Sequence, residues 1–399
     1  MAYTKYEQFS DRAEVLASAP FARILGKGTN NRATFPTDLI CFSHLRWGFV
    51  YQRPQHLMTR FAKNSRLFYV EEPVETEATD PWLAVYDAVA GIKLLVPQLP
   101  KGLSGTEAEA AQCAVLEKAF AAFDTQRPIL WYYNPMAPQL ADRLRAAAVV
   151  YDCMDELSGF RNAPQALLTR ERALLNRANV VFTGGYSLYE AKRDRHSNIY
   201  PFPSSVDVAH FAQARVLEEP TDQAALPRPR LGFYGVIDER FDVDLLGAIA
   251  RMRPDWQFII LGPVVKIDPA MLPQAVNIHY PGMRGYTELP AYLSGWDVAL
   301  MPFAMNASTR FISPTKTPEY LAAGCPVVST PITDVVRTYG KTGIVQIART
   351  PDEFVTACER ALKIDRNAPQ WLNSIDRVLA DMSWDATWQR MKEIVECVL

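Results

Sequence analysis

Two charged residues three positions apart could bind a phosphorylated ligand. Lys316 and Glu319 lie in the segment 313–330, where Pro318 suits the first turn of a helix and Pro326 ends helical structure. The start of such a helix offers free N–H groups and a positive dipole end to an anion. A lysine there can bind phosphate, and a carboxylate can accept two hydrogen bonds from a ribose diol. The segment favours a nucleotide-phosphate site, although the pair would also suit the solvated face of an ordinary βα crossover.

A second group of polar residues follows the first expected strand, at 38–43. His44, Arg46, Trp47 and Arg53 lie in the loop and helix start that come after this strand. Ligands of parallel α/β sheets bind beyond the carboxyl ends of the strands, so these side chains are candidates for a cleft. The arginines could equally solvate a helix face.

Later strand ends also carry polar residues. Asn134 follows one expected strand, and Asp152 and Asp155 follow the next. The two aspartates could position acceptor hydroxyls or serve as a general base, and they could equally form Asx turns.

The segment 313–330 and the block 47–56 resemble the GT-B glycosyltransferases, in particular the family-four-like group of teichuronic-acid-type surface-polysaccharide enzymes. The resemblance implies an α/β chain with two Rossmann-like, doubly wound parallel-sheet domains that face each other across a cleft. It also implies that Lys316 contacts the donor diphosphate and that Glu319 contacts the ribose.

The same resemblance assigns residues to each side of the cleft. The implied donor side is Arg240, Gly282, Met283, Arg284, Ser308, Ser313, Lys316 and Glu319. The turn at 282–284 would meet the base through backbone groups, and Arg240 would reach the donor phosphates. The implied acceptor side is His44, Arg46, Trp47, Arg53 and Asn134. The residues expected to carry catalysis are Asp152, Asp155, Arg240 and Lys316.

Two positions depart from the family pattern. Retaining members carry Glu-x7-Glu, but Phe311 stands eight residues before Glu319. A histidine often precedes the acidic residue of the last loop of the first domain, and Met154 occupies that place. The stereochemical outcome and the donor sugar therefore stay open, and no histidine base is expected at position 154.

The alternation of apolar strands with helical stretches predicts parallel sheets. Expected strands are 38–43, 66–70, 92–96, 129–133, 149–152, 180–183, 230–235, 256–261, 276–280 and 297–302. The expected units are an extension (1–36, with a helix near 11–25), an N-terminal domain (37–212), a linker (213–229), a C-terminal domain (230–380) and a helix (381–399) that crosses back.

Composition narrows the functional class. The 399 residues carry a net charge of −2 and are 49% hydrophobic, which suits two domains and argues against a nucleic-acid binder. No apolar run is long enough for a membrane span, and the first residues lack a signal-peptide pattern. Six scattered cysteines fit reduced thiols. We expect a cytoplasmic protein, with peripheral association at the inner face of the membrane as an option.

One short motif invites a metal-site interpretation. Asp242 and Asp244 form a D-x-D pattern, but at the expected start of a helix they suit capping. The histidines show no spacing typical of zinc ligands. We therefore expect no metal ion and no cofactor beyond the nucleotide-sugar substrate.

These expectations combine into one function and two alternatives. The expected function is a metal-independent hexosyltransferase-type reaction from a UDP-sugar to the hydroxyl of a glycan, lipid-linked or small-molecule acceptor in surface-polysaccharide or glycolipid assembly. A catalytically silent GT-B protein that binds nucleotide sugars or acts as a scaffold is the alternative that Phe311 favours. A nicotinamide oxidoreductase would share the layout, but no G-x-G-x-x-G follows the first strand.

Overall fold

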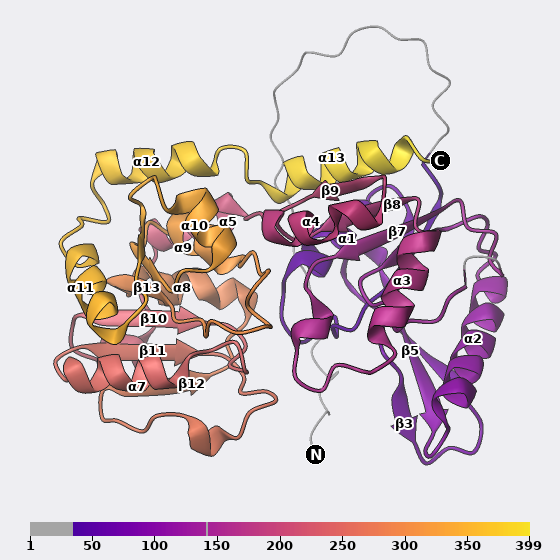
Figure 1. Cartoon of the computed structure of the whole chain (residues 1–399), viewed down its shortest axis with the longest axis horizontal. Coiled ribbons are helices and arrows are strands. Elements are labelled where there is room, and N and C mark those ends of the chain that lie inside the picture. The colour runs from indigo at the N-terminus through magenta and orange to yellow at the C-terminus, as the bar shows by residue number, and fades with distance from the viewer. Residues whose placement is uncertain (1–34, 141–142) are drawn as a thin grey trace, which may run out of the picture.

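The computed structural model describes residues 35–140 and 143–399, which form two α/β domains that lie side by side (Figure 1). The expected extension at 1–36 lies outside the described residues except for its last two, and so does the helix expected near 11–25. Within the described ranges, no helix is long and apolar enough to cross a membrane.

The N-terminal domain is built on a sheet of order β3-β5-β2-β1-β6-β7-β8-β9, with β4 also paired to β5. Its strands are β1 (Asp38–Phe42), β2 (Arg66–Val70), β3 (Val74–Thr76), β4 (Trp82–Asp87), β5 (Lys93–Pro100), β6 (Ile129–Tyr132), β7 (Ala148–Cys153), β8 (Val180–Thr183) and β9 (Ile199–Pro201). All pairs are parallel except β4 with β5. The expected strands all form, and β3, β4 and β9 are additions.

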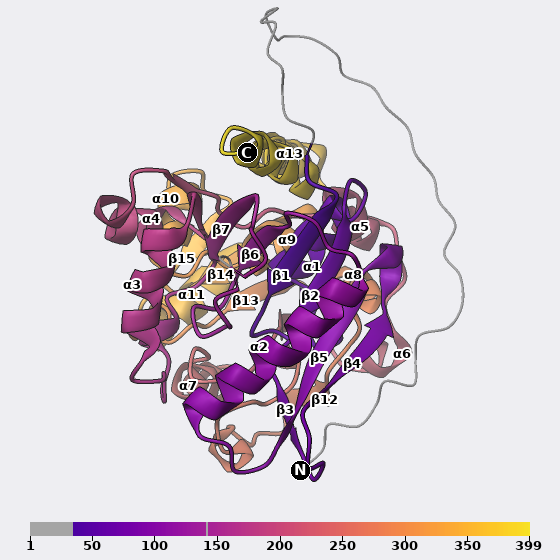
Figure 2. The ribbon, with the colours of Figure 1, turned by 90° about the vertical axis from the view of Figure 1, so that its right-hand side faces the viewer.

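Both faces of this sheet are buried by helices. The helices of this domain are α1 (Arg53–Phe61), α2 (Gly105–Ala122), α3 (Leu167–Arg177) and α4 (Tyr186–Lys192), whereas α5 (Val208–Ala212) packs on the C-terminal domain. Along β1, Leu39 and Cys41 join one apolar cluster, whereas Ile40 and Phe42 join another. This alternation explains why β1 is apolar from Leu39 to Phe42, as parallel strands covered on both faces usually are. Figure 2 shows α2 lying across the outer side of the domain.

The C-terminal domain repeats this plan on a parallel sheet of order β12-β11-β10-β13-β14-β15. Its strands are β10 (Arg230–Tyr234), β11 (Gln257–Leu261), β12 (Ile278–Gly282), β13 (Val298–Met301), β14 (Val327–Ser329) and β15 (Val345–Ile347). Its helices are α6 (Thr221–Ala224), α7 (Val243–Met252), α8 (Leu289–Ser294), α9 (Lys316–Ala322), α10 (Thr333–Tyr339), α11 (Pro351–Ala361) and α12 (Pro369–Leu379). The expectation of two doubly wound parallel-sheet domains is confirmed.

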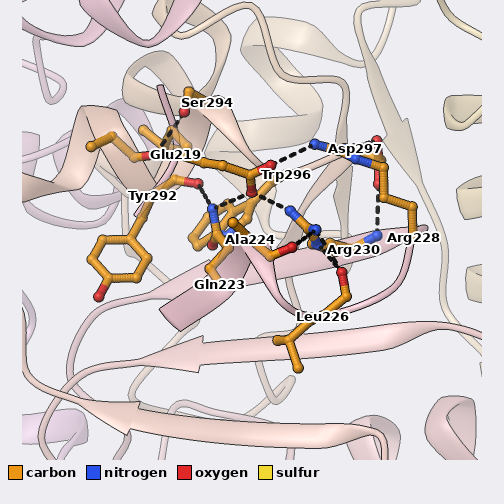
Figure 3. Close-up of polar contacts among 12 residues, drawn as sticks. Glu219, Gln223, Ala224, Leu226, Arg228, Arg230, Tyr292, Ser294, Trp296 and Asp297 are labelled. Atoms are coloured by element: carbon orange, nitrogen blue, oxygen red, sulfur yellow. Dashed lines mark hydrogen bonds and ion pairs between the residues drawn. The ribbon is translucent and has the colours of Figure 1, made fainter. Parts of the chain in front are cut away.

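The segment 213–229, which the sequence suggests as an open linker, packs on the C-terminal domain. The side-chain oxygen of Gln223 accepts a hydrogen bond from Trp296 Nε1 at 2.9 Å. Arg230, the first residue of β10, forms an ion pair with Glu219 of the segment (Figure 3). Polar residues of this segment therefore hold it against the start of β10.

The last helix, α13 (Trp384–Glu396), leaves the C-terminal domain and packs on α1 of the N-terminal domain (Figure 1). Trp384 stacks on the His56 ring with 4.7 Å between ring centres. Arg60 Nε lies 2.9 Å from Asp385 Oδ1. The two domains are therefore joined both by the chain before β10 and by this returning helix.

Candidate functional site

Lys316 begins α9, and its side chain passes close to the end of β10. Gly235 has φ of +139°, which other residues rarely adopt, and a Cβ atom on it would lie 2.2 Å from Lys316 Cε. No hydrogen bond or ion pair joins the ammonium group to any residue that the structure describes. Burial is the main cause that lowers the pKa of Lys316 to about 8, against the opposing effect of Glu319. A partly buried cation that forms no direct ion pair can bind an anionic ligand.

Glu319 lies almost one turn further along α9 and is oriented by a tyrosine. Its side chain is buried, and Oε2 accepts a hydrogen bond from Tyr234 Oη at 2.5 Å. Tyr234 is the last residue of β10, and its N–H donates to Tyr320 Oη at 3.0 Å. Burial raises the pKa of Glu319, whereas Tyr234 and Lys316 act in the opposite direction. The carboxylate is thus fixed in direction beside Lys316.

Arg240 follows β10 in the loop before α7, where Asp238 holds its guanidinium group. Nε and Nη2 of Arg240 lie 3.0 and 2.7 Å from the carboxylate oxygens of Asp238. The ring centre of Phe160, from the other domain, lies 5.3 Å from Arg240 Cζ and 5.8 Å from Lys266 Nζ. Arg240 would bind an anion while paired with Asp238, whereas Lys316 would bind it without an ion-pair partner among the described residues.

Asp155 belongs to the N-terminal domain, in the loop after β7, and faces these cations. Burial is the largest effect and raises the pKa of Asp155, while Arg240, Arg53 and Lys316 lower it and Asp238 raises it further. Within the part of the chain that the structure describes, its carboxylate forms no hydrogen bond or ion pair. The structure therefore brings together three of the four residues expected to carry catalysis.

The fourth, Asp152, lies inside the N-terminal domain instead. Its side chain is fully buried, and Arg53 Nη2 donates to its Oδ1 at 2.8 Å. Arg53 Nη1 also donates to the carbonyl oxygen of Phe202 at 2.7 Å. Asp152 and Arg53 are therefore each other's partners in this structure, and the roles expected of them toward an acceptor stay predictions. The two residues form a buried ion pair that ties β7 to the start of α1.

Three other residues expected on the acceptor side have partners within their own domain. Arg46 Nη1 donates to Glu71 Oε2 at 2.9 Å and to the carbonyl oxygen of Glu72 at 2.6 Å. Trp47 is buried, and its backbone N–H donates to Glu71 Oε1 at 2.8 Å. Asn134 Nδ2 donates to Glu72 Oε1 at 3.0 Å. These contacts hold the loops at the sheet edge, and the expected acceptor-side role of the three residues stays a prediction.

His44 is the acceptor-side residue whose ring keeps an unused polar atom. Its Nδ1 atom is buried and forms no hydrogen bond within the described ranges. Burial lowers the pKa of His44 to about 4, and Lys266 and Arg240 act in the same direction. The imidazole is therefore neutral at neutral pH and faces the C-terminal domain as a hydrogen-bonding group.

The turn that ends β12 offers backbone groups more than side chains. Gly282 has φ of +85°, and no atom lies within 4 Å of a Cβ built on it. Met283 is 46% exposed. Arg284 is held by Tyr292 Oη at 2.5 Å and by Asp222 Oδ2 at 3.1 Å, so its side chain stabilises the turn.

The loop before α9 is held partly by its own residues and partly by the other domain. Ser308 Oγ donates to Asn306 Oδ1 at 2.7 Å. The carbonyl oxygen of Ser313 accepts a hydrogen bond from Ser204 Oγ of the N-terminal domain at 2.6 Å. Phe311, between them, packs against an apolar cluster of that same domain. The residue at the family's glutamate position is therefore an interdomain contact.

The D-x-D residues act on helix α7. Asp242 is its N-cap, with Oδ1 accepting from the N–H of Leu245 at 2.9 Å, and Asp244 lies in the first turn. The expected capping role is confirmed. Among the residues described, no group of three or more His, Cys, Asp or Glu residues could hold a metal ion.

A cavity of about 830 Å³ also lies between the domains, with Ser313, Thr317, Phe202 and Met382 among its lining residues. Lys316, Arg240 and Asp155 are not part of its lining, so the charged cluster and this cavity are separate.

Sequence reasoning missed Tyr234, Phe160 and Lys266. Tyr234 is the next-to-last residue of the expected strand 230–235, just before its glycine, and that position could have identified it. Phe160 has no comparable signal, because its contact with Arg240 depends on how the two domains pack.

Comparisons with known proteins identify this arrangement. Residues 228–363, which include Arg240, Lys316 and Glu319, match the family model described as Glycosyl transferases group 1. The chain also superimposes on sucrose-phosphate synthase from Thermosynechococcus elongatus with a TM-score of 0.68 and 15% identity, covering 91% of this chain and 99% of that one. The chain has the GT-B fold, and its C-terminal domain matches this glycosyltransferase family model.

This GT-B protein is 24% identical over 262 residues to TuaH of Bacillus subtilis (strain 168), whose name assigns it to teichuronic acid biosynthesis. The match covers 61% of this chain and 65% of TuaH, so the GT-B protein spans about two-thirds of that relative. It also resembles WaaG, a glycosyltransferase involved in lipopolysaccharide biosynthesis, with a TM-score of 0.63 and 12% identity, covering 90% of this chain and 99% of WaaG. A trehalose-6-phosphate structure from E. coli bound with UDP-2-fluoro glucose gives a TM-score of 0.65 and 12% identity, covering 91% and 99% of the two chains.

Proposed function

We propose that this protein transfers a sugar from UDP to a hydroxyl group of an acceptor in surface-polysaccharide or glycolipid assembly. The observation that carries the proposal is Lys316, whose partly buried side chain lies next to Gly235 at the end of β10 and whose ammonium group forms no ion pair within the described residues. The family match of the C-terminal domain and the relative named for teichuronic acid biosynthesis support it.

In the proposed complex, the donor lies mainly on the C-terminal domain. Lys316 binds the diphosphate, and Glu319 accepts hydrogen bonds from the ribose diol. Arg240 adds a second, partly neutralised positive charge near the phosphates. The backbone of the turn at Gly282 meets the base. UDP is proposed as the nucleotide because the E. coli neighbour was bound with UDP-2-fluoro glucose.

The proposed chemical step uses one group from each domain. An acceptor hydroxyl attacks the anomeric carbon while the bond from that carbon to the diphosphate oxygen breaks. Asp155 takes the hydroxyl proton, and Lys316 stabilises the negative charge that develops on the leaving diphosphate. A carboxylate opposite the donor would give inversion, which suits a site with Phe311 at the position of the retaining family's glutamate.

UDP release decides between transfer and the silent alternative. The protein is incubated with UDP-glucose, UDP-galactose or UDP-N-acetylglucosamine, with and without glycan acceptors, and released UDP is measured. The proposal expects release from at least one donor and saturable UDP binding by calorimetry. UDP binding without release from any donor would favour a catalytically silent binding protein. Phe311 favours this alternative because it stands where retaining members carry a glutamate. No UDP binding would overturn both.

We also propose that transfer is independent of metal ions, because Lys316 and Arg240 can supply the positive charge that a metal supplies elsewhere. UDP release should survive excess EDTA. Asp242→Ala should lower the stability of the fold by about 1 kcal/mol through loss of the N-cap, without changing turnover. Loss of release on chelation, restored by Mn²⁺, would contradict this prediction.

Glu319→Gln should remove the preference for ribose over 2′-deoxyribose. The wild-type carboxylate is held by Tyr234 and can accept from the diol. The amide loses one acceptor and the negative charge, and hydrogen bonds to charged groups contribute about 1.5–3 kcal/mol. We expect wild type to bind UDP roughly tenfold or more tightly than 2′-deoxy-UDP, and the variant to bind both alike. Equal affinities in wild type would show that Glu319 does not contact the ribose.

A further inference from the structure

The loop after β7 links the two domains next to the proposed base. Asp155 lies at its start and faces Arg240 and Lys316. A Cβ on Gly159 would lie 2.7 Å from the carbonyl oxygen of Ala307, so the loop touches the C-terminal domain closely. The N–H of Arg161 donates to Glu239 Oε1 of that domain at 2.9 Å. The direction in which this loop leaves β7 therefore decides where Asp155 points.

Glu156, the neighbour of Asp155, anchors the loop to the body of its own domain. Its Oε2 atom lies 2.8 Å from Nζ of Lys192, whose side chain is only 1% exposed. Its Oε1 atom accepts from Ser158 Oγ at 2.6 Å, a contact within the loop. The contact of Glu156 with Lys192 thus links the loop to α4.

Lys192 is in turn fixed from two other elements. Its Nζ atom lies 2.5 Å from Oε1 of Glu171 on α3. The same oxygen accepts from Tyr151 Oη at 2.9 Å, and Tyr151 lies on β7 itself. Arg195 lies 3.4 Å from the other oxygen of Glu171. The network joins α3, α4 and β7 to the loop that carries Asp155.

We propose that Glu156, Lys192 and Glu171 position Asp155 toward the donor site. The inference rests on the proposed function. Buried ion pairs contribute little net stability over well-packed apolar residues, and in some proteins they fix one conformation. Here the network holds Glu156, which is the next residue in the chain after the proposed base, Asp155. Its partners keep Lys192 charged, since the carboxylates raise its pKa despite the lowering effect of burial.

Glu156→Ala is the variant that tests this role. It releases the loop while Lys192 keeps Glu171 as its counter-ion, so no buried charge loses every partner. We expect kcat for UDP release to fall at least about tenfold, with the Kd for UDP unchanged within about twofold, because a misplaced base lowers only the chemical step. Glu156→Gln can still accept from Lys192 and should restore kcat to within about threefold of wild type.

Glu109→Ala is the matched control, because it also removes an ion-paired acid from the same domain. Glu109 pairs with Arg170 between α2 and α3, and within the described residues it forms no hydrogen bond or ion pair with the loop. Its kcat should equal that of wild type. Thermal unfolding of all variants shows whether each is folded at the assay temperature.

Hydrogen exchange keeps the proposal testable if no donor is turned over. Amides 155–161 should exchange faster in Glu156→Ala than in wild type, Glu156→Gln or Glu109→Ala, whatever the activity. Unchanged exchange would overturn the positioning role. Faster exchange with a kcat equal to wild type would also overturn it, because the loop would then be anchored without consequence for Asp155. An inactive wild type with the expected exchange pattern would count against the proposed function and leave the anchoring intact.

Discussion

Asp155→Asn is expected to lower kcat for the proposed transfer by roughly 10²–10⁴ and to leave UDP binding unchanged, because a positioned general base contributes about that factor. The asparagine has nearly the same shape but cannot take up the proton of an acceptor hydroxyl. Asp155 suits the role because its carboxylate has no partner in the described structure and burial raises its pKa toward the working range. Turnover and UDP affinity, measured on the same samples, separate the two steps.

The pH dependence gives an independent reading of the same residue. A base must be deprotonated to act, so kcat/KM should fall as pH drops below the raised pKa of Asp155. This acidic limb should disappear from the residual activity of Asp155→Asn.

Asp152→Asn is the control for Asp155, since it changes the neighbouring carboxylate in the same way. It breaks the buried pair with Arg53, and loss of one partner from such a pair costs about 3–5 kcal/mol of stability. Its main effect should therefore appear in thermal unfolding, with turnover per folded molecule much less affected. Near-normal turnover in both variants would eliminate a carboxylate base and favour a front-face retaining mechanism.

Lys316→Met is expected to raise the Kd for UDP by roughly 10- to 100-fold, because a hydrogen bond to a charged group contributes about 1.5–3 kcal/mol. Affinity for uridine should be unchanged, since the lysine is proposed to contact only phosphate. Lys392→Met is the control, because that lysine pairs with Glu396 on α13, away from the loops that carry the site. Identical UDP titrations for Lys316→Met and wild type would refute the diphosphate assignment.

The lowered pKa of Lys316 adds a signature in pH. The ammonium form predominates below about 8, so UDP binding should be strongest there and should weaken by about tenfold per pH unit above it. Binding by Lys316→Met should lack this alkaline limb. Lys316→Arg should keep affinity above that pH if the larger side chain is tolerated next to Gly235.

The elements that carry the site could be predicted because their signals are local. β1, β7 and β10 are short apolar runs followed by polar or glycine residues, and sheet strands buried on both faces require this pattern. Lys316 and Glu319 were predictable together because they share the first turn of one helix, so the same segment places both.

The roles of Asp152 and Asp155 could not be separated by the same reasoning. Asp152 still belongs to β7, so its side chain points into the domain, whereas Asp155 follows the strand and faces the other sheet. The partner that decides this, Arg53, lies 99 residues earlier in the chain. Phe311 is a similar case, because its contact is made with the opposite domain.

The lack of an ion pair at Lys316 among the described residues also affects the stability of the folded protein. In the absence of an anion, a desolvated ammonium group opposes folding, and Gly235 beside it adds the conformational freedom of the unfolded chain. A sequence optimised only for thermal resistance would replace Lys316 but keep Gly235, whose φ of +139° other residues rarely adopt. A bound anion reverses the balance, since ligand present at 100 times its Kd stabilises the folded state by about 2.7 kcal/mol. Without a bound anion, the protein is therefore less stable than it could be, because of a residue that is proposed to bind the donor.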